Sequence, residues 1–218
     1  MKKIIVMIMA VFCLGISAQA QKKVKSINVI PDNAKIIIAG VEVATGYYSL
    51  TMGREDYVLI KFTAPGYLDQ TVRVYKSDKS TSRTFKLEQD AAYFASDEGS
   101  DLANKTMRIV VRKGMSADEV WKRITYYITD QFPNMEIIDK SAGWIRTAWN
   151  SETFQYATVR TRIEIKEMPG MDDLTYRIEL QSEIAWRSCG LNDQCFSKWE
   201  RILKKYKKAV EDLKNSVE

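Results

Sequence analysis

The sequence predicts a two-domain α+β protein, in which a small all-β domain precedes an antiparallel sheet packed on a long C-terminal helix. Three patterns support this prediction. Residues 26–88 are short β-rich runs separated by glycine and proline, residues 107–186 combine one helix with several strands, and residues 196–217 repeat apolar side chains at helical spacing. A chain of 218 residues, 45% hydrophobic and 28% charged, has room for two small domains and is neither disordered nor of low complexity.

The first 20 residues have the pattern of a secretory signal peptide. Lys2 and Lys3 give a basic start, Ile4–Ile16 is an apolar run, and Ala18-Gln19-Ala20 is a small-x-small cleavage site. The run is shorter than the roughly 20 residues that a membrane-spanning helix needs. We therefore expect cleavage after Ala20, export to the periplasm or the outer membrane, and no transmembrane span in the mature chain.

The cysteine in this segment does not predict a lipid anchor. A bacterial lipoprotein is cut directly before a cysteine that follows small residues, but Phe12 precedes Cys13 and the cut would divide the apolar run. We interpret Cys13 as an apolar residue of the removed segment.

The composition argues against catalysis. The chain has no histidine, which excludes Ser–His and Cys–His nucleophile pairs and removes the commonest zinc ligand. No phosphate-binding loop, dinucleotide fingerprint or nucleophile elbow is present. The net charge of +5 is small, and no basic stripe is interleaved with aromatic residues. We expect no catalytic residue, no metal, no cofactor and no nucleic-acid partner.

Two cysteines remain in the mature chain. Cys189 and Cys195 flank the turn-like residues 190–194, and thiols outside the cytoplasm tend to be oxidised, which predicts a disulfide. A metal pair and a redox pair are the alternatives. Two thiolates without histidine make only half of a zinc site, and the spacing is not the C-x-x-C of redox motifs.

Residues 21–88 predict an all-β domain. Short alternating runs at spacings of about 8–12 residues, with glycine and proline between them, are typical of a small sandwich or barrel. The expected strands are residues 26–30, 35–38, 41–43, 57–62, 71–75 and 81–87.

The turns of this domain carry a resemblance. A P-x-x-A turn leads into a strand that ends in a glycine hairpin, and a later strand leads into a Gly-Tyr pair. In these features residues 21–88 resemble the PEGA domain family, although Tyr47-Tyr48 stands where the family usually has Thr-Pro. The resemblance implies an extracytoplasmic accessory β-module of a kind suspected of binding envelope components, without catalytic residues. The matching residues are Ile30–Ala34, Ile36–Gly40, Gly46, Leu50, Gly53, Tyr57–Ile60 and Ala64–Tyr67.

Three tyrosines of this domain are candidate ligand-binding residues. Tyr47 and Tyr48 form an aromatic pair that we expect to be exposed, and either ring could stack on a sugar. Tyr67 follows Gly66 at a β corner, where a packed aromatic is the alternative to a sugar-stacking ring.

Residues 89–105 predict a linker because they are rich in Ala, Ser and Asp and have no clear period. The second domain, residues 106–218, begins with a strand at 107–112. Ser116–Glu119 is a capping box, which predicts a helix that runs to about Gln131 and stops before Pro133.

Four strands are expected next, at residues 135–139, 143–149, 156–166 and 174–186. The last two alternate apolar and charged residues, which is typical of an antiparallel sheet with one covered and one wet face. The residues expected to point inward are Val159, Thr161, Ile163, Ile165, Leu174, Tyr176, Ile178, Leu180, Ile184 and Trp186.

The final segment predicts a long amphipathic helix. Apolar residues recur at spacings of 3, 4, 3, 4, 3 and 4, which places them on one stripe. The stripe would pack on the covered face of the sheet, and a coiled-coil partner is the alternative. The four lysines at positions 204, 205, 207 and 208 have acidic neighbours and indicate a solvated face. The stripe consists of Phe196, Trp199, Leu203, Tyr206, Val210, Leu213 and Val217.

The order strand, helix, four strands, helix is that of a helix-grip domain. The helix that contains Val120-Trp121, a short strand ending in Asp139 and the G-x-I-x-T-x-W strand at Gly143–Trp149 resemble the domains of the outer-membrane assembly lipoprotein called NlpB or BamC. The resemblance implies a non-catalytic scaffold.

These patterns together predict a non-catalytic exported protein that binds an envelope polysaccharide or an envelope protein. A carrier of a hydrophobic ligand is one alternative, because Trp144, Trp149 and Trp186, with Trp199, could line or fill the space between sheet and helix. An envelope hydrolase that uses carboxylates is the second. It is weakly supported, since the adjacent acidic pairs lie in turns, where they usually bond to the local backbone.

Overall fold

A computed structural model describes residues 23–99, 101–189 and 192–218, so the expected signal peptide and Cys13 lie outside the described residues. The chain divides into two compact units. Unit 1 comprises the residues up to Thr63 together with Asp69–Leu87, and unit 2 comprises Ala64–Leu68 together with Glu88–Glu218. Each unit is described by itself.

Unit 1 is built from two sheets. One has the strand order β4-β1-β7, with β4 antiparallel and β7 parallel to β1, and the other is antiparallel with the order β3-β2-β5-β6. Phe62 and Phe85, one from each sheet, have ring centroids 5.0 Å apart, so the sheets share an apolar core. The strands are β1 (Val24–Ile30), β2 (Lys35–Ile38), β3 (Val41–Thr45), β4 (Tyr47–Thr51), β5 (Tyr57–Thr63), β6 (Gln70–Tyr75) and β7 (Ser82–Lys86).

The turns of unit 1 explain its glycines. Gly46 has φ +69°, and a Cβ there would lie 2.4 Å from the carbonyl oxygen of Asp32, so only glycine fits. This tight turn allows β4 to return beside β1. The strand β4 is not among the strands predicted from the sequence.

Unit 2 contains one seven-stranded sheet and three α-helices among its described residues. The main path of the sheet is β10-β11-β13-β14-β15, with β12 added to β13 and β9 added to β14. A separate two-stranded sheet pairs β8 with β16. The elements are α1 (Ala91–Phe94), β8 (Ser96–Glu98), β9 (Thr106–Val110), α2 (Ala117–Gln131), β10 (Met135–Asp139), β11 (Trp144–Thr147), β12 (Asn150–Thr153), β13 (Ala157–Glu167), β14 (Thr175–Trp186), η1 (Asp193–Cys195), β15 (Ser197–Lys198), β16 (Arg201–Leu203) and α3 (Lys204–Val217).

The predicted helix α2 is confirmed, including its start. The Ser116 hydroxyl accepts a hydrogen bond from the amide of Glu119 at 3.2 Å, and the helix ends at Gln131. The carboxylate of Glu119 pairs with Arg123 at 2.9 Å.

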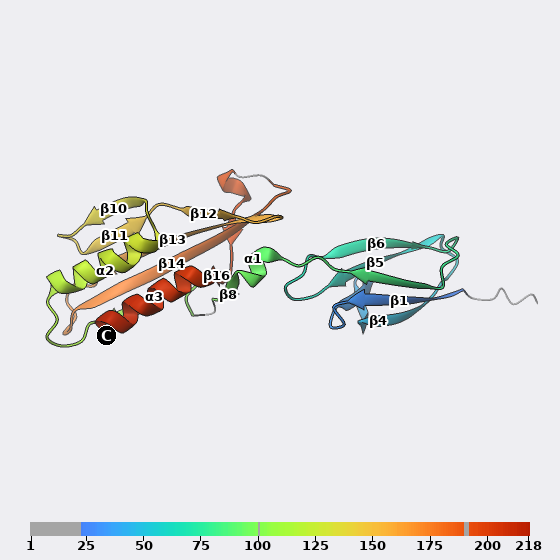
Figure 1. Cartoon of the computed structure of the whole chain (residues 1–218), viewed down its shortest axis with the longest axis horizontal. Helices are drawn as coiled ribbons and strands as arrows, with labels where there is room; N and C mark the ends of the chain where they lie inside the picture. Colours follow the sequence, from blue (N-terminus) through green and yellow to red (C-terminus); the bar gives the residue numbers. More distant parts are fainter. Residues whose placement is uncertain (1–22, 100, 190–191) are drawn as a thin grey trace, which may run out of the picture. The chain divides into compact units, whose positions relative to one another are not determined.

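The helices α2 and α3 cover the same face of the sheet. The buried side chains of α2 and α3 belong to one apolar core with the inward residues of β13 and β14, and Figure 1 shows the two helices on one side of these strands. The alternation expected for β13 is confirmed, because Val159, Thr161, Ile163 and Ile165 are buried while the residues between them are not. Among the described residues no α-helix packs on the opposite face of this sheet, where the short 3-10 helix η1 contacts Arg160 through Asp193.

The expected α+β fold with a long helix gripped by the sheet is wrong. The chain is mostly β, with 47% strand and 19% helix, and the C-terminal helix has only 14 residues from Lys204. Residues 197–203 contain β15 and β16, which pair with β14 and β8. Backbone hydrogen bonds to distant strands, such as that from Trp199 to Ser182 at 2.9 Å, replace the intrahelical bonds that the spacing predicted.

The structure also bears on residues 89–105, on Trp186, on the disulfide and on membrane-spanning helices. Residues 89–105, expected as a linker, contain α1 and β8 and belong to unit 2. Trp186, expected to point inward, is 45% exposed at the end of β14. The predicted disulfide is confirmed, with Cys189 and Cys195 joined and their Cα atoms 5.6 Å apart. Within the described ranges, none of the helices combines the length and apolar character required to cross a bilayer.

Candidate functional site

The structure separates the Tyr47-Tyr48 pair. The two residues lie on β4 and therefore face opposite sides of its sheet. Tyr47 is 54% exposed, with its hydroxyl 3.4 Å from that of Ser26, whereas Tyr48 lies opposite the buried Ile27 and is half-buried. They do not form a continuous aromatic surface.

Tyr67 packs inside unit 2. Its ring contacts Phe94 edge-on with centroids 6.3 Å apart, and Phe94 contacts Tyr93 in the same way. A Cβ on the neighbouring Gly66 would lie 3.0 Å from both of these rings, so the site is close-packed. These contacts support the packed-aromatic alternative for Tyr67.

Trp144 and Trp149 do not lie between the sheet and the helices. Trp144 lies opposite Lys166, whose amine is 5.0 Å from the indole centre, on the uncovered face of the sheet. Trp149 stacks under the guanidinium groups of Arg160 and Arg162 at 4.5 and 4.4 Å. The helix-covered core contains the rings of Phe132 and Tyr206, and of the four candidate tryptophans Trp199 packs against it.

The uncovered face of the four-stranded sheet in unit 1 presents a cluster whose residues are not among the predicted ligand-binding residues. Tyr57 on β5 lies directly opposite Tyr75 on β6, with ring centroids 5.7 Å apart and planes inclined at 53°. Two residues further along, Leu59 lies opposite Arg73. We call Tyr57, Leu59, Arg73 and Tyr75 the tyrosine face.

The tyrosine face is exposed and held in place. Tyr57, Leu59 and Tyr75 are 40%, 49% and 44% exposed, while the alternate residues Ile60 and Val74 are fully buried and anchor the two strands. The guanidinium of Arg73 lies 5.2 Å from the ring centre of Tyr57, a cation–π contact that orients the ring.

This arrangement has a definite chemistry. Aromatic rings on a flat sheet stack against the apolar faces of sugar rings, and the tyrosine hydroxyls and the Arg73 guanidinium can bond to sugar hydroxyls. At the edge of the cluster, Lys61 is already paired with Asp69 at 2.7 Å. Arg73 has no acidic partner among the described residues and is therefore available to a ligand at this face.

One signal could have identified the cluster from the sequence. Alternation in Tyr57–Phe62 places Tyr57 and Leu59 opposite to the apolar residues between them, so an outward aromatic follows from the pattern. The partner strand and its register do not follow, because Tyr75 is brought opposite Tyr57 only by the pairing of β5 with β6.

At one end of the uncovered face of unit 2, Arg160 is paired with groups of the protein itself. The side chain of Arg160 is 12% exposed and lies between the rings of Trp149 and Phe196, at 4.5 and 4.0 Å. It also pairs with Glu183 at 2.7 Å and with Asp193 of the disulfide loop. At this end of the face the guanidinium of Arg160 is therefore already paired with carboxylates.

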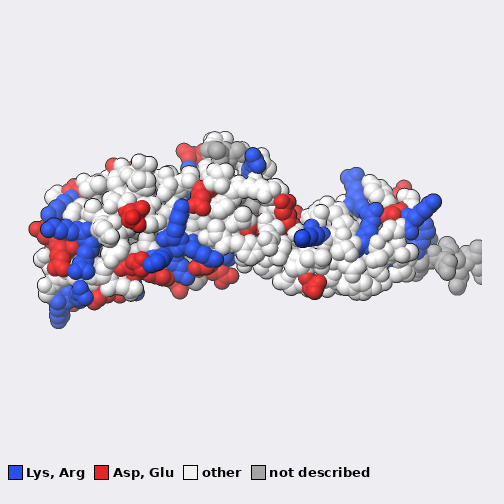
Figure 2. All heavy atoms as spheres, in the orientation of Figure 1, with Lys and Arg blue, Asp and Glu red and all other residues white. Residues whose placement is uncertain are grey.

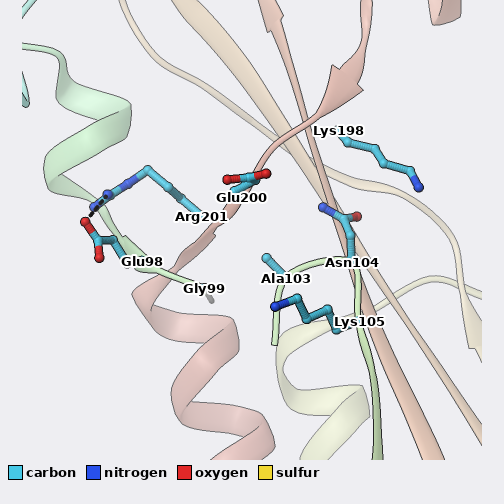
Figure 3. A pocket seen from close by; sticks show the side chains of 8 residues that line it. All are labelled: Glu98, Gly99, Ala103, Asn104, Lys105, Lys198, Glu200 and Arg201. Carbon is cyan, nitrogen blue, oxygen red and sulfur yellow. Dashed lines mark ion pairs between the residues drawn. The ribbon is translucent and has the colours of Figure 1, made fainter. Parts of the chain in front are cut away.

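Unit 2 also contains two neighbouring depressions, of 520 and 470 Å³, which share Glu98 and Gly99. In the larger one, Figure 3 shows that the charged ends of Lys198 and Arg201 point to opposite sides, with Arg201 facing Glu98 at 4.0 Å. The cations do not converge on one point, so this depression does not resemble an anion site.

The acidic pairs of the sequence are ion-paired or exposed. Asp97 and Glu98 pair with Lys207 at 3.4 Å and Arg201 at 4.0 Å, and the pairs Glu55-Asp56 and Asp172-Asp173 are exposed. Among the described residues, no group of three or more acidic or cysteine side chains is placed to hold a metal ion.

The pKa shifts have structural causes. The pKa of Asp139 is lowered by hydrogen bonds from the Ser141 hydroxyl and the Ala142 amide. The pKa of Tyr176 is raised to about 12 by burial and by the nearby carboxylate of Glu167.

The lysines of α3 form the expected solvated face. Figure 2 shows basic and acidic side chains interleaved on this side of unit 2. Lys205 pairs with Glu152, and the distances are 3.4 Å from Lys207 to Asp97 and 2.6 Å from Lys208 to Asp212.

Comparison with known proteins identifies no family. No family model matches the chain, and no curated protein matches it. The resemblances to the PEGA family and to NlpB or BamC therefore stay predictions.

Proposed function

We propose that this protein is an exported, non-catalytic binding protein of the cell envelope, and that the tyrosine face of unit 1 binds an envelope polysaccharide. The observation that carries the proposal is the exposed Tyr57–Tyr75 pair, with Arg73 beside Tyr57, on a sheet face that no described element covers. The signal-peptide pattern of residues 1–20 and the Cys189–Cys195 disulfide support an oxidising location outside the cytoplasm.

The cost of leaving this face exposed favours a ligand over a purely structural role. Three large apolar residues remain between 40% and 49% exposed on adjacent strands, where a charged or small polar residue would serve solubility better. Arg73 adds a donor beside the rings without covering Tyr75, for which no cation contact is found among the described residues.

The proposal is tested by binding of the full chain to isolated peptidoglycan sacculi, measured by co-sedimentation. The double variant Tyr57→Ala/Tyr75→Ala removes both rings, and we expect its affinity to fall at least about tenfold, which corresponds to about 1.4 kcal/mol. Tyr126→Ala is the matched control, because Tyr126 is 70% exposed on α2 and contacts only Tyr127 among the described rings. This control should bind like the parent protein.

Tyr47→Ala separates the structure-based site from the sequence-based one. Tyr47 is exposed but has no aromatic neighbour among the described residues, so its loss should leave binding within about twofold of the parent. Sedimentation that does not saturate, equal losses in all variants, or turnover of the polymer would reject the proposal. Binding of an envelope protein in place of sacculi, lost in the same double variant, would assign the face to a protein partner.

A further inference from the structure

We propose that unit 2 carries a second binding site, on the uncovered face of its sheet, for a polysaccharide with one acidic group on each sugar ring. The site is a row of three cations, Lys166 on β13, Arg177 on β14 and Arg108 on β9. Lys166 lies directly opposite Arg177, and Arg177 lies directly opposite Arg108. We call these three residues the cation row.

All three cations point to the same face. Residues directly opposite one another in an antiparallel pair have their side chains on one side of the sheet. The alternate residues Ile165, Tyr176 and Ile109 are 1–2% exposed and point into the helix-covered core. The cation row therefore faces away from α2 and α3.

Placing three cations side by side lowers the stability of the folded sheet. Neighbouring strands are about 4.8 Å apart, so three positive charges lie within about 10 Å. Like charges directly opposite each other destabilise a sheet. If no ligand bound here, replacing any one of the three cations with a neutral residue would stabilise the folded protein.

The compensation inside the protein is incomplete. The Lys166 amine contacts the ring of Trp144 at 5.0 Å, and Arg177 pairs with Glu164 at 3.3 Å while 43% of its side chain stays exposed. Arg108 is exposed and has no ion pair or hydrogen bond from its side chain among the described residues. This pattern contrasts with Arg160 on the same face, which is stacked and paired.

The surroundings restrict how an anion can approach. Two positions along the strands, Glu164 lies opposite Glu179, and these carboxylates repel an anion from that side. On the other side, Val110 lies opposite Thr175 and is 49% exposed. At the end of the row Asp139 lies opposite Trp144. The open approach is thus over the cation row itself and the apolar surface of Val110.

The ligand class follows from this geometry. The cations repeat across strands, so a chain lying over them runs perpendicular to β13 and β14 and meets one charge at each strand. Trp144 at one end and Val110 beside the row give apolar surface for ring faces. A polymer of acidic sugar rings offers both the repeated charge and the apolar ring faces.

The test uses the full chain and polygalacturonate, which has one carboxylate on each ring, with dextran as the neutral polymer, in isothermal titration calorimetry at low ionic strength. We expect saturable binding of polygalacturonate alone. The variant Arg108→Gln/Lys166→Gln should bind at least about tenfold more weakly, and Arg108→Lys, which keeps the charge, should stay close to the parent. Arg54→Gln is the matched control, since Arg54 is exposed in unit 1 and has no partner among the described residues.

Thermal unfolding of Arg108→Gln distinguishes a binding role from a structural one. The unfolding temperature should stay equal or rise, because one of the like charges is removed. A lower unfolding temperature, equal losses of affinity in Arg54→Gln and the row variant, or no saturable binding of polygalacturonate would each overturn the proposal.

The same titration keeps this inference separate from the tyrosine face. Tyr57→Ala/Tyr75→Ala should bind polygalacturonate like the parent protein, whatever its effect on sacculi. If that variant loses polygalacturonate binding as well, the cation row is not a site of its own.

Discussion

The ring of Phe132 stacks on the ring of Tyr206, with centroids 4.6 Å apart and planes inclined at 24°. Phe132 directly follows α2, Tyr206 lies on α3, and both side chains are fully buried. This contact joins the two helices that cover the sheet of unit 2.

Phe132→Ala should therefore be among the most destabilising single changes in unit 2. Removing a buried phenylalanine leaves a cavity and typically lowers the free energy of unfolding by about 3–5 kcal/mol. Urea unfolding followed by far-UV circular dichroism measures this change. Phe94→Ala is the matched control, because Phe94 is 47% exposed, and it should lose much less. Similar losses in both variants would show that the stacked pair does not hold the helices together.

The stability of unit 2 should fall in alkaline solution because of Tyr176. Its pKa is raised to about 12 in the folded protein, mainly by burial and then by the Glu167 carboxylate, while the ordinary tyrosine pKa is 10.0. Between these values the unfolded chain has released the proton and the folded chain has kept it, so the free energy of unfolding decreases as the pH rises from about 10 to 12. The loss is on the order of 2 kcal/mol.

Urea unfolding at pH 9 and pH 11.5 checks this prediction. Tyr176→Phe has no hydroxyl to ionise and should lose less stability over the same interval than the parent. An equal loss in both proteins would assign the alkaline sensitivity to other groups.

Removal of the disulfide should cost stability without unfolding the sheet. The bridge spans a sequence separation of 6 residues, and closure of so short a loop contributes roughly 2 kcal/mol in the chain-entropy model. The loop also supplies Asp193, which pairs with Arg160, and leads into Phe196, which stacks on it. Cys189→Ser/Cys195→Ser should unfold at lower urea concentration than the oxidised parent, and reduction of the parent with dithiothreitol should give the same shift. A reduced parent as stable as the oxidised one would contradict the prediction.

Local signals made α2 predictable. Its capping box, its apolar spacing and Pro133 all lie within 20 residues, and each acts through neighbours in the sequence. The alternation of β13 was equally visible because every second residue is buried by the same layer.

The C-terminal segment shows where local pattern fails. The apolar spacing through Phe196 and Trp199 continues that of α3, yet the first of these residues stacks on Arg160 and the second is hydrogen-bonded to β14. Both partners are remote in the sequence, so tertiary contacts override the helical spacing. The tyrosine face and the cation row could not be predicted from the sequence for the same reason. Tyr57 lies opposite Tyr75, and Arg177 opposite Arg108, only because of the strand register.

The side chain of Asn104 hydrogen-bonds to the backbone of β14 and to the backbone of Trp199, the residue that follows β15. Its amide nitrogen donates to the carbonyl oxygens of Ser182 at 3.0 Å and Trp199 at 2.9 Å, and its side-chain oxygen accepts from the Ser182 amide at 3.0 Å. The backbone amide of Asn104 donates to Leu180 at 2.8 Å, and the residue has φ +56°, in the left-handed region that asparagine tolerates better than most residues.

This geometry makes the amide irreplaceable by a carboxylate of the same shape. Asn104→Asp would place a negative oxygen against the two carbonyl oxygens to which the amide now donates, so it should destabilise the protein more than Asn104→Ala, which only leaves those groups unbonded. Loss of three hydrogen bonds predicts a decrease of about 2–4 kcal/mol for Asn104→Ala. Asn104→Gly loses the same bonds but adopts φ +56° without strain, and it should therefore be more stable than Asn104→Ala by up to about 1 kcal/mol. Urea unfolding of the three variants at neutral pH measures the order Gly, Ala, Asp; an aspartate variant as stable as the parent would show that the Asn104 amide does not bridge β14 and the segment that follows β15.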